Sequence, residues 1–214
     1  TPVDRRVEAA MRPYFTLRFG NPSSLHRFGQ EAIAAVDEAR ERIASAIGAG
    51  FREVIFTGSA TEANNLALRG ALKAFRFELL DFSGNEKKLL TAKSYKLKPR
   101  IIVSAIEHES VLKTSQALRK EGVDVGVLPV DKRGTVDLRR LKRFLNERTV
   151  LVPVMYANNE TGVIEPIPEI ADVIRVFRTA SRSPYPLFHT DAAQALQFLD
   201  CNVQMLGADF MTLS

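Results

Sequence analysis

Apolar residues recur along the chain with two spacings, one typical of helices and one typical of buried strands. Between residues 25 and 49 they return every three or four positions, which predicts an amphipathic helix that Ser23 or Ser24 could cap. Its apolar face consists of Phe28, Ala32, Ala35, Val36, Ala39, Ile43 and Ile47. Runs such as VIFT and VLVPVMY are apolar throughout instead, as in parallel strands that are buried on both faces.

After residue 50, predicted strands and predicted helices take turns. Strands are predicted at residues 53–57, 100–106, 123–130, 150–156, 186–191 and 209–214. Helices are predicted at residues 60–75, 109–122, 136–147 and 168–180. This alternation predicts an α/β fold in α/β/α layers, with a mostly parallel sheet that helices cover on both faces.

Length and composition suit one large domain with a small leading segment. The chain has 214 residues, of which 45% are apolar, and this is enough for a full core. We expect residues 1–22 to form an N-terminal segment and residues 23–214 to form the large domain. Residues 76–99 are polar and rich in lysine and delay the next strand, which predicts a surface insertion.

Composition also indicates the cellular compartment of the protein and the kinds of partner that it binds. No run of about 18 apolar residues is present, so no membrane span is expected. The start lacks the apolar stretch of a signal peptide, and the single cysteine, Cys201, cannot form an internal disulfide. A reducing cytoplasm is therefore expected, with Cys201 as a packed structural residue. Much of the net charge of +5 lies in residues 87–100 and 139–143, which are typical of solvated faces, so no nucleic-acid partner is expected.

The ends of the predicted strands carry the candidate chemistry, because ligands of parallel α/β sheets bind at the carboxyl ends of strands. The segment Gly58-Ser59-Ala60-Thr61 begins a predicted helix, where free N–H groups and hydroxyls could bind a phosphate. A plain helix cap by Ser59 or Thr61 explains the same residues. His108 could stack on an aromatic ligand, act as a base or be merely structural. It forms no metal-ligand spacing with His26 or His189, so no metal site is expected.

Two further strand ends carry amide and carboxyl side chains. Asn158 and Asn159 could bind a polar ligand or could simply be turn formers. Asp191 could cap a helix, but a carboxylate at the end of a buried strand is costly without a positive partner. Gln194 follows three residues later, the spacing of one helical turn. Together, these strand ends describe a flat, phosphorylated ligand with a basic ring nitrogen, an outline that pyridoxal phosphate fits.

A set of motifs in matching order resembles the cysteine desulfurase branch of the class V aminotransferases. The motifs are TPVDRRVEAAM, GNPSSLHRFGQEA, VIFTGSATEANNLA, IEHESVL, MYANNETGVIEPI and HTDAAQALQFLD. They cover nearly the whole chain, and residues 76–99 are the main interruption. The resemblance implies the large domain of the fold type I enzymes that use pyridoxal phosphate.

The resemblance assigns cofactor contacts to residues of this chain. Ala60 and Thr61 match residues that hold the cofactor phosphate, and Ser214 would be a further phosphate contact. His108 matches the histidine that stacks on the pyridine ring, where it is also a candidate acid or base.

The remaining matches lie around the ring and the substrate. Asn159 matches the asparagine near the substrate carboxylate and a cofactor oxygen. Asp191 matches the partner of the ring nitrogen, and Gln194 matches the residue bonded to the ring hydroxyl. These assignments agree with the strand-end interpretation.

The resemblance implies a pyridoxal-phosphate-dependent cysteine desulfurase. Such an enzyme converts L-cysteine to L-alanine and passes the sulfur on as a persulfide for iron–sulfur cluster or thio-cofactor assembly. It also implies a homodimer and a sulfur-acceptor protein. A selenocysteine lyase, another class V aminotransferase and a non-catalytic module with the same fold are alternatives.

The resemblance also bears on the ends of the chain. The Schiff-base lysine and the nucleophilic cysteine of the family would lie beyond Ser214, and an opening strand would precede Thr1. We therefore expect a fragment that is inactive by itself.

Overall fold

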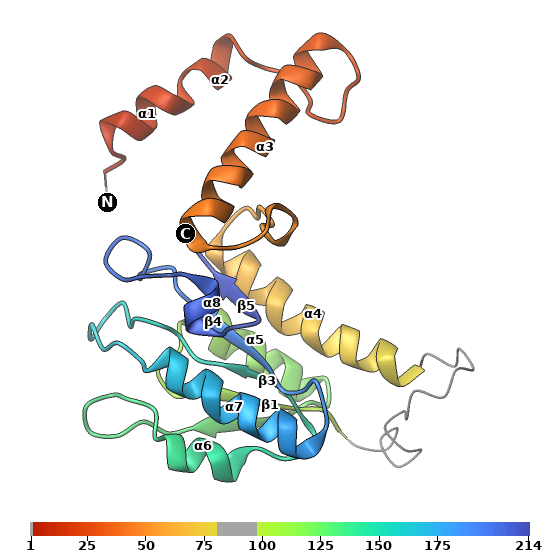
Figure 1. The fold of residues 1–214 in the computed structure, drawn as a ribbon, viewed down its shortest axis with the longest axis vertical. Helices are drawn as coiled ribbons and strands as arrows, with labels where there is room; N and C mark the ends of the chain where they lie inside the picture. Colours follow the sequence, from red (N-terminus) through yellow and green to blue (C-terminus); the bar gives the residue numbers. More distant parts are fainter. Residues whose placement is uncertain (1, 81–97) are drawn as a thin grey trace. The chain divides into compact units, whose positions relative to one another are not determined.

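A computed structural model describes residues 2–80 and 98–214, which belong to two compact units, Thr1–Ile55 and Phe56–Ser214 (Figure 1). The expected insertion at residues 76–99 lies largely outside the described residues. Its first positions continue helix α4, which runs from Ala60 to Leu80.

The first unit is helical. It contains α1 (Arg5–Met11), α2 (Pro13–Thr16), α3 (Arg27–Ile47) and the 3-10 turn η1 (Phe51–Glu53). Helix α3 confirms the helix predicted at residues 25–49, and Gly48 ends it in a left-handed conformation with φ of 68°. The prediction of a serine cap is wrong, because the imidazole of His26 accepts the N–H of Gly29 at 3.3 Å. Ser23 instead donates its N–H to the Asn21 side chain in a preceding turn.

The second unit is built on a parallel sheet of five strands in the order β2-β1-β3-β4-β5. The strands are β1 (Arg100–Ser104), β2 (Asp124–Leu128), β3 (Thr149–Pro153), β4 (Leu187–Asp191) and β5 (Phe210–Thr212). Each matches a strand predicted from the apolar runs.

The predicted strand at residues 53–57 is absent. Residues 54–57 have no regular structure, and Ile55 and Phe56 are 69% and 46% exposed. Apolar composition alone cannot form a strand, because a strand needs a neighbour that takes up its backbone hydrogen bonds. No described strand pairs with this segment.

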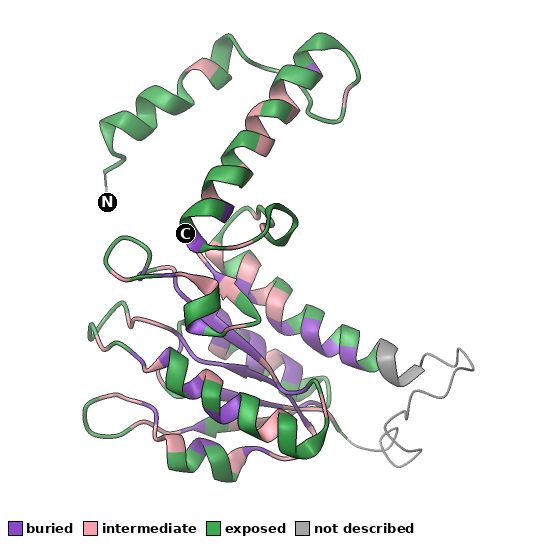
Figure 2. Ribbon diagram, viewed as in Figure 1, coloured by how far each residue is buried: buried purple, intermediate pink, exposed green. Residues whose placement is uncertain are grey.

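Helices cover both faces of the sheet, as predicted for an α/β/α sandwich. They are α4, α5 (Glu109–Lys120), α6 (Leu138–Phe144), α7 (Ile167–Ser181) and the short α8 (Val203–Leu206). Alternate residues of β1 point to opposite faces, so Ile101 packs with α4 and α5 while Ile102 packs with α6 and α7. The buried strands lie between partly exposed helices in Figure 2.

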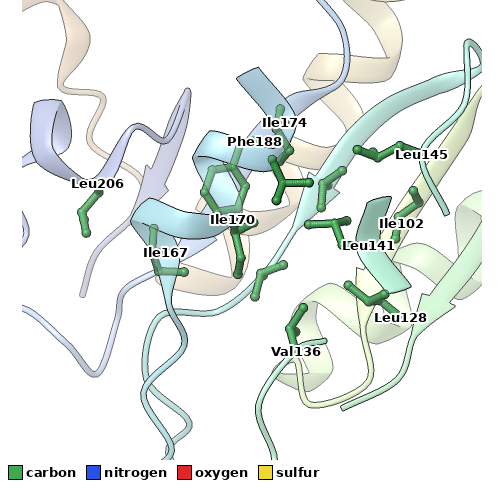
Figure 3. Packing of buried hydrophobic residues seen from close by; sticks show 13 residues of the cluster. Ile102, Leu128, Val136, Leu141, Leu145, Ile167, Ile170, Ile174, Phe188 and Leu206 are labelled. Atoms are coloured by element: carbon green, nitrogen blue, oxygen red, sulfur yellow. The ribbon is translucent and has the colours of Figure 1, made fainter. Parts of the chain in front are cut away.

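Strand β4 lies in the middle of the second cluster and is held firmly at its start. Phe188 is completely buried and packs near Ile170 and Ile174 of α7 (Figure 3). The Arg178 guanidinium donates to the Pro186 carbonyl at 2.7 Å and forms an ion pair with Asp209. Because parallel strands all end at one edge, this sheet brings the loops after its strands together at that edge.

Candidate cofactor-binding site

Asp191 ends β4 as a nearly buried carboxylate that is only 5% exposed. Its Oδ1 accepts the N–H of Ala193 at 3.0 Å, and its Oδ2 accepts the side-chain N–H of Asn64 at 2.7 Å. Each oxygen therefore has one protein donor and keeps a lone pair for a further donor. Residues 193–198 form hydrogen-bonded turns rather than a regular helix, and Gln194 is exposed there.

A chain of hydrogen bonds joins Asp191 to His108. The Asn64 amide also donates to the Ser110 hydroxyl at 2.8 Å, and that hydroxyl lies 2.8 Å from Nδ1 of His108. His108 is the N-cap of α5, where its Nδ1 accepts the Ser110 N–H at 3.1 Å. The His108 ring itself is exposed at the sheet edge. Two residues far apart in sequence thus belong to one site.

The sequence pattern did not indicate Asn64 or Ser110, although Asn64 lies in the motif VIFTGSATEANNLA and Ser110 lies in IEHESVL. Asn64 precedes Leu68, Ala71 and Phe75 on the buried face of α4. A polar residue in register with an apolar stripe is the signal that marks it, because buried polar groups need partners.

Side chains of the first turn cap the start of α4. The Ser59 hydroxyl accepts the N–H of Glu62 at 3.2 Å, and the Glu62 carboxylate accepts the N–H of Gly58 at 2.7 Å. The helix cap that the sequence allowed for Ser59 is therefore present. Ala60 is the first helical residue, and Thr61 is exposed beside it. The first N–H groups of a helix have no partner within it, so this turn can still receive an anion.

The two adjacent asparagines after β3 have different surroundings. Asn158 organises the loop, since its Oδ1 accepts the N–H of Thr161 at 2.8 Å and its Nδ2 donates to the Ile106 carbonyl at 2.9 Å. Asn159 is exposed at the tip of this turn. Ser214 is likewise exposed after β5. The predicted site residues therefore all lie at the carboxyl ends of strands or at the start of α4, which reaches that edge through Asn64.

Buried acids lie beneath the edge, and sequence reasoning missed them. Glu107 is 5% exposed and accepts hydrogen bonds from the Ser104 hydroxyl at 2.5 Å and the Met155 N–H at 2.6 Å. Burial raises the pKa of Glu107 to about 7, and the nearby carboxylates of Asp191 and Glu165 act in the same direction. Burial likewise raises the pKa of Glu165 to about 7.

His189 lies two residues before Asp191 on β4 and is fully buried. Its Nε2 is 3.0 Å from the Thr212 hydroxyl of β5. Burial lowers the pKa of His189 to about 4, against the opposing influence of Asp191. The imidazole is therefore neutral near pH 7.

Other features of the described residues lie apart from this edge. An open cleft of about 690 Å³ is lined by Asn146, Glu147, Arg148, Phe177, Ala180 and Ser181, near the amino end of β3. Within residues 2–80 and 98–214, no group of three or more acidic, histidine or cysteine residues could hold a metal ion. Over the same residues, no helix has the length and apolar character to span a membrane. Cys201 is buried, as expected of a packed residue.

A match to a protein-family model assigns the chain to one class of protein. The family model of the class-V aminotransferases matches residues 1–78 and 87–214. The chain therefore belongs to the aminotransferase class-V family, which confirms the resemblance found in the motifs. Enzymes of this class and their cysteine desulfurase relatives depend on pyridoxal phosphate, so the expected cofactor is confirmed for the family.

Within this family, curated relatives that resemble the chain are named cysteine desulfurases. Cysteine desulfurase IscS of Dictyoglomus turgidum is 41% identical over 214 residues, which are 100% of this chain and 48% of that protein. Cysteine desulfurase IscS 1 of Archaeoglobus fulgidus is 41% identical, with 100% of this chain and 49% of the relative covered.

Solved structures agree in fold. A NifS-like protein superposes with a TM-score of 0.84 at 34% identity, over 100% of this chain and 52% of that one. SspA in complex with cysteine gives a TM-score of 0.83 at 33% identity, over 100% of this chain and 54% of that one. The chain thus spans about half the length of the relatives that it matches.

Proposed function

We propose that this chain is the cofactor-binding part of a cysteine desulfurase, an enzyme that converts L-cysteine to L-alanine. The sulfur is passed on as a persulfide for iron–sulfur cluster or thio-cofactor assembly. The observation that carries the proposal is the hydrogen-bonded chain that joins Asp191 to His108. The similarity to cysteine desulfurases across the whole chain supports this activity over others of the class.

The residues at the sheet edge fit pyridoxal phosphate. Asp191 is held by one donor on each oxygen and can still accept the N–H of a protonated ring nitrogen. Small residues, Ala192 and Ala193, follow it and leave room for a flat ring. The start of α4 at Ala60 and Thr61 suits the phosphate. When bound, the cofactor supplies an electron sink for carbanions.

His108 would act at the face of the ring. Its Nδ1 accepts the Ser110 N–H, so the neutral imidazole carries its proton on Nε2. We assign Asn159 to the substrate carboxylate and a cofactor oxygen, Gln194 to the ring hydroxyl and Ser214 to the phosphate. Their exposed side chains at the strand ends support these roles.

The partners and the organisation follow from the same proposal. L-Cysteine is the substrate, a sulfur-acceptor protein receives the persulfide, and the enzyme is a cytoplasmic homodimer with residues 23–214 as its cofactor-binding domain and residues 1–22 as an N-terminal segment. Apolar side chains of the first unit support self-association, because they are unusually exposed. Phe15 and Leu17 are 71% and 76% exposed, and Met11 is 48% exposed.

The cofactor assignment is tested by replacing Asp191 with asparagine. We expect Asp191→Asn to weaken binding of pyridoxamine phosphate about 10- to 100-fold, because a charge-assisted hydrogen bond becomes a neutral one. Equilibrium dialysis measures the dissociation constant, and pyridoxamine phosphate is used because it forms no Schiff base with lysines. Asp200→Asn is the matched control, since Asp200 is an exposed aspartate after the same strand. Absence of binding by the wild-type chain, or equal binding by both variants, would refute the assignment.

A further inference from the structure

Asn64 is a buried amide that serves two elements of the site at once. It lies on α4 with 0% of its surface exposed. Its Nδ2 donates to Asp191 Oδ2 at 2.7 Å and to Ser110 Oγ at 2.8 Å, so both amide hydrogens are used. An ionised carboxylate can only accept, which requires Nδ2 rather than Oδ1 to face Asp191.

This orientation leaves the other half of the amide unpaired. Asn64 Oδ1 is buried and has no hydrogen-bond partner among the described residues. A buried carbonyl without a partner costs stability, and an apolar side chain of similar size would avoid that cost. Stability of α4 alone therefore favours leucine at this position over asparagine. The presence of asparagine here, with its buried carbonyl oxygen unpaired, therefore indicates a role in the site rather than in the stability of the helix.

The second hydrogen of Asn64 reaches His108 through Ser110. Because the Ser110 hydroxyl accepts from Asn64, its own proton is free to point to His108 Nδ1, which is 2.8 Å away. The backbone N–H of Ser110 points to the same nitrogen. Two donors at Nδ1 hold the ring in one orientation and place its proton on Nε2.

We propose that Asn64 is a positioning residue that aims the carboxylate of Asp191 and, through Ser110, orients the ring of His108. A single amide then holds both Asp191, which would meet the ring nitrogen, and His108, which would lie on the face of the ring. The proposal rests on the proposed function for the identity of the ligand. The hydrogen bonds that it describes belong to this chain alone, so they can be tested without any ligand.

The groups around Asp191 show which hydrogen-bond donors its carboxylate keeps when Asn64 is replaced. The titratable neighbours of Asp191 are His189 on β4 and Glu107 after β1, whose pKa values its charge raises, and neither donates a hydrogen bond to it in the described structure. Without Asn64, the N–H of Ala193 is the remaining donor to the carboxylate. We therefore expect the Asp191 carboxylate to be less firmly oriented in Asn64→Leu, because one of its oxygens loses its hydrogen-bond donor.

The test uses leucine because it matches asparagine in size and donates nothing. Asn65→Leu is the matched control, since Asn65 also links α4 to α5 but does not contact Asp191. Its Nδ2 donates to the Thr61 carbonyl at 2.9 Å, and its Oδ1 accepts from the Thr114 hydroxyl at 2.8 Å. Carbon-13 NMR at one fixed pH reports the hydrogen bonding of the Asp191 carboxyl, and nitrogen-15 NMR reports that of the His108 ring. Asn64→Leu should change both signals, whereas Asn65→Leu should change neither.

A second variant separates the two arms of the network. Ser110→Ala should alter the nitrogen-15 shifts of His108 and leave the carbon-13 signal of the Asp191 carboxyl unchanged, because the hydrogen bond between Asn64 and Asp191 remains. If Asn64→Leu does not fold, Asn64→Ala provides the same measurement without added bulk. An unchanged carbon-13 signal of the Asp191 carboxyl in the folded Asn64 variant would overturn the proposal.

Ligand binding then connects the network to the site. We expect Asn64→Leu to bind pyridoxamine phosphate about 10-fold more weakly than Asn65→Leu, because the carboxylate that would meet the ring nitrogen is no longer held in place. Equal affinities would refute the link to the ligand. If the wild-type chain binds no ligand, the proposed function fails, and the NMR comparison of the variants alone decides the role of Asn64.

Discussion

Replacing Phe188 with alanine is expected to lower the free energy of unfolding by about 3–5 kcal/mol. Phe188 is 0% exposed in the cluster between the sheet and helices α6 and α7. Removing its ring loses the transfer free energy of the apolar atoms and leaves a cavity, because the surrounding strands relax only in part. Urea denaturation followed by circular dichroism measures the change.

Phe198→Ala is the control for this experiment. Phe198 is 79% exposed in the turns that follow β4, so its removal should change the free energy of unfolding by no more than about 0.5 kcal/mol. Equal effects of the two substitutions would contradict the packing of β4 between helices. Because β4 carries Asp191 three positions further on, that result would also remove the structural support for the site.

We expect the free energy of unfolding of the wild-type protein to fall as the pH rises through about 7, because Glu107 then ionises. Glu107→Gln should abolish this fall. The folded-state pKa of about 7 lies above the ordinary value of 4.5, so folded Glu107 keeps a proton that the unfolded chain has lost. Stability from this group is therefore complete below about pH 4.5 and falls as the pH rises through about 7. The full shift corresponds to about 3 kcal/mol. Glutamine does not ionise, and its oxygen can still accept from Ser104 and Met155.

The measurement is the difference in free energy of unfolding between Glu107→Gln and the wild type at each pH, because the wild-type profile alone contains the titration of other groups. His189 has a lowered pKa of about 4, so it adds stability as the pH rises from about 4 to its ordinary value of 6.5 and partly masks Glu107. The free energy of unfolding of Glu107→Gln relative to wild type should increase between pH 5 and pH 8. Glu109→Gln, at an exposed neighbour, should give a profile parallel to that of the wild type. A constant difference for Glu107→Gln would contradict the raised pKa.

The sequence by itself determined the order of the elements and the class of the fold. The apolar run VLVPVMY marked strand β3, and the helical spacing of residues 25–49 identified α3. Strand ends also indicated where Asp191 and His108 would lie, because a parallel sheet brings such ends to one edge. These features depend on local patterns, which the chain carries in its primary structure.

Only the tertiary structure decided the contacts between distant residues. The apolar segment at residues 54–57 has no strand neighbour and stays irregular, while His26 rather than a serine caps α3. Asn64 meets Asp191 because α4 packs on the sheet, and Glu107 acquires its raised pKa because that packing excludes water. Hydrogen bonding and burial depend on groups brought together from separate elements, so periodicity along the chain cannot predict them.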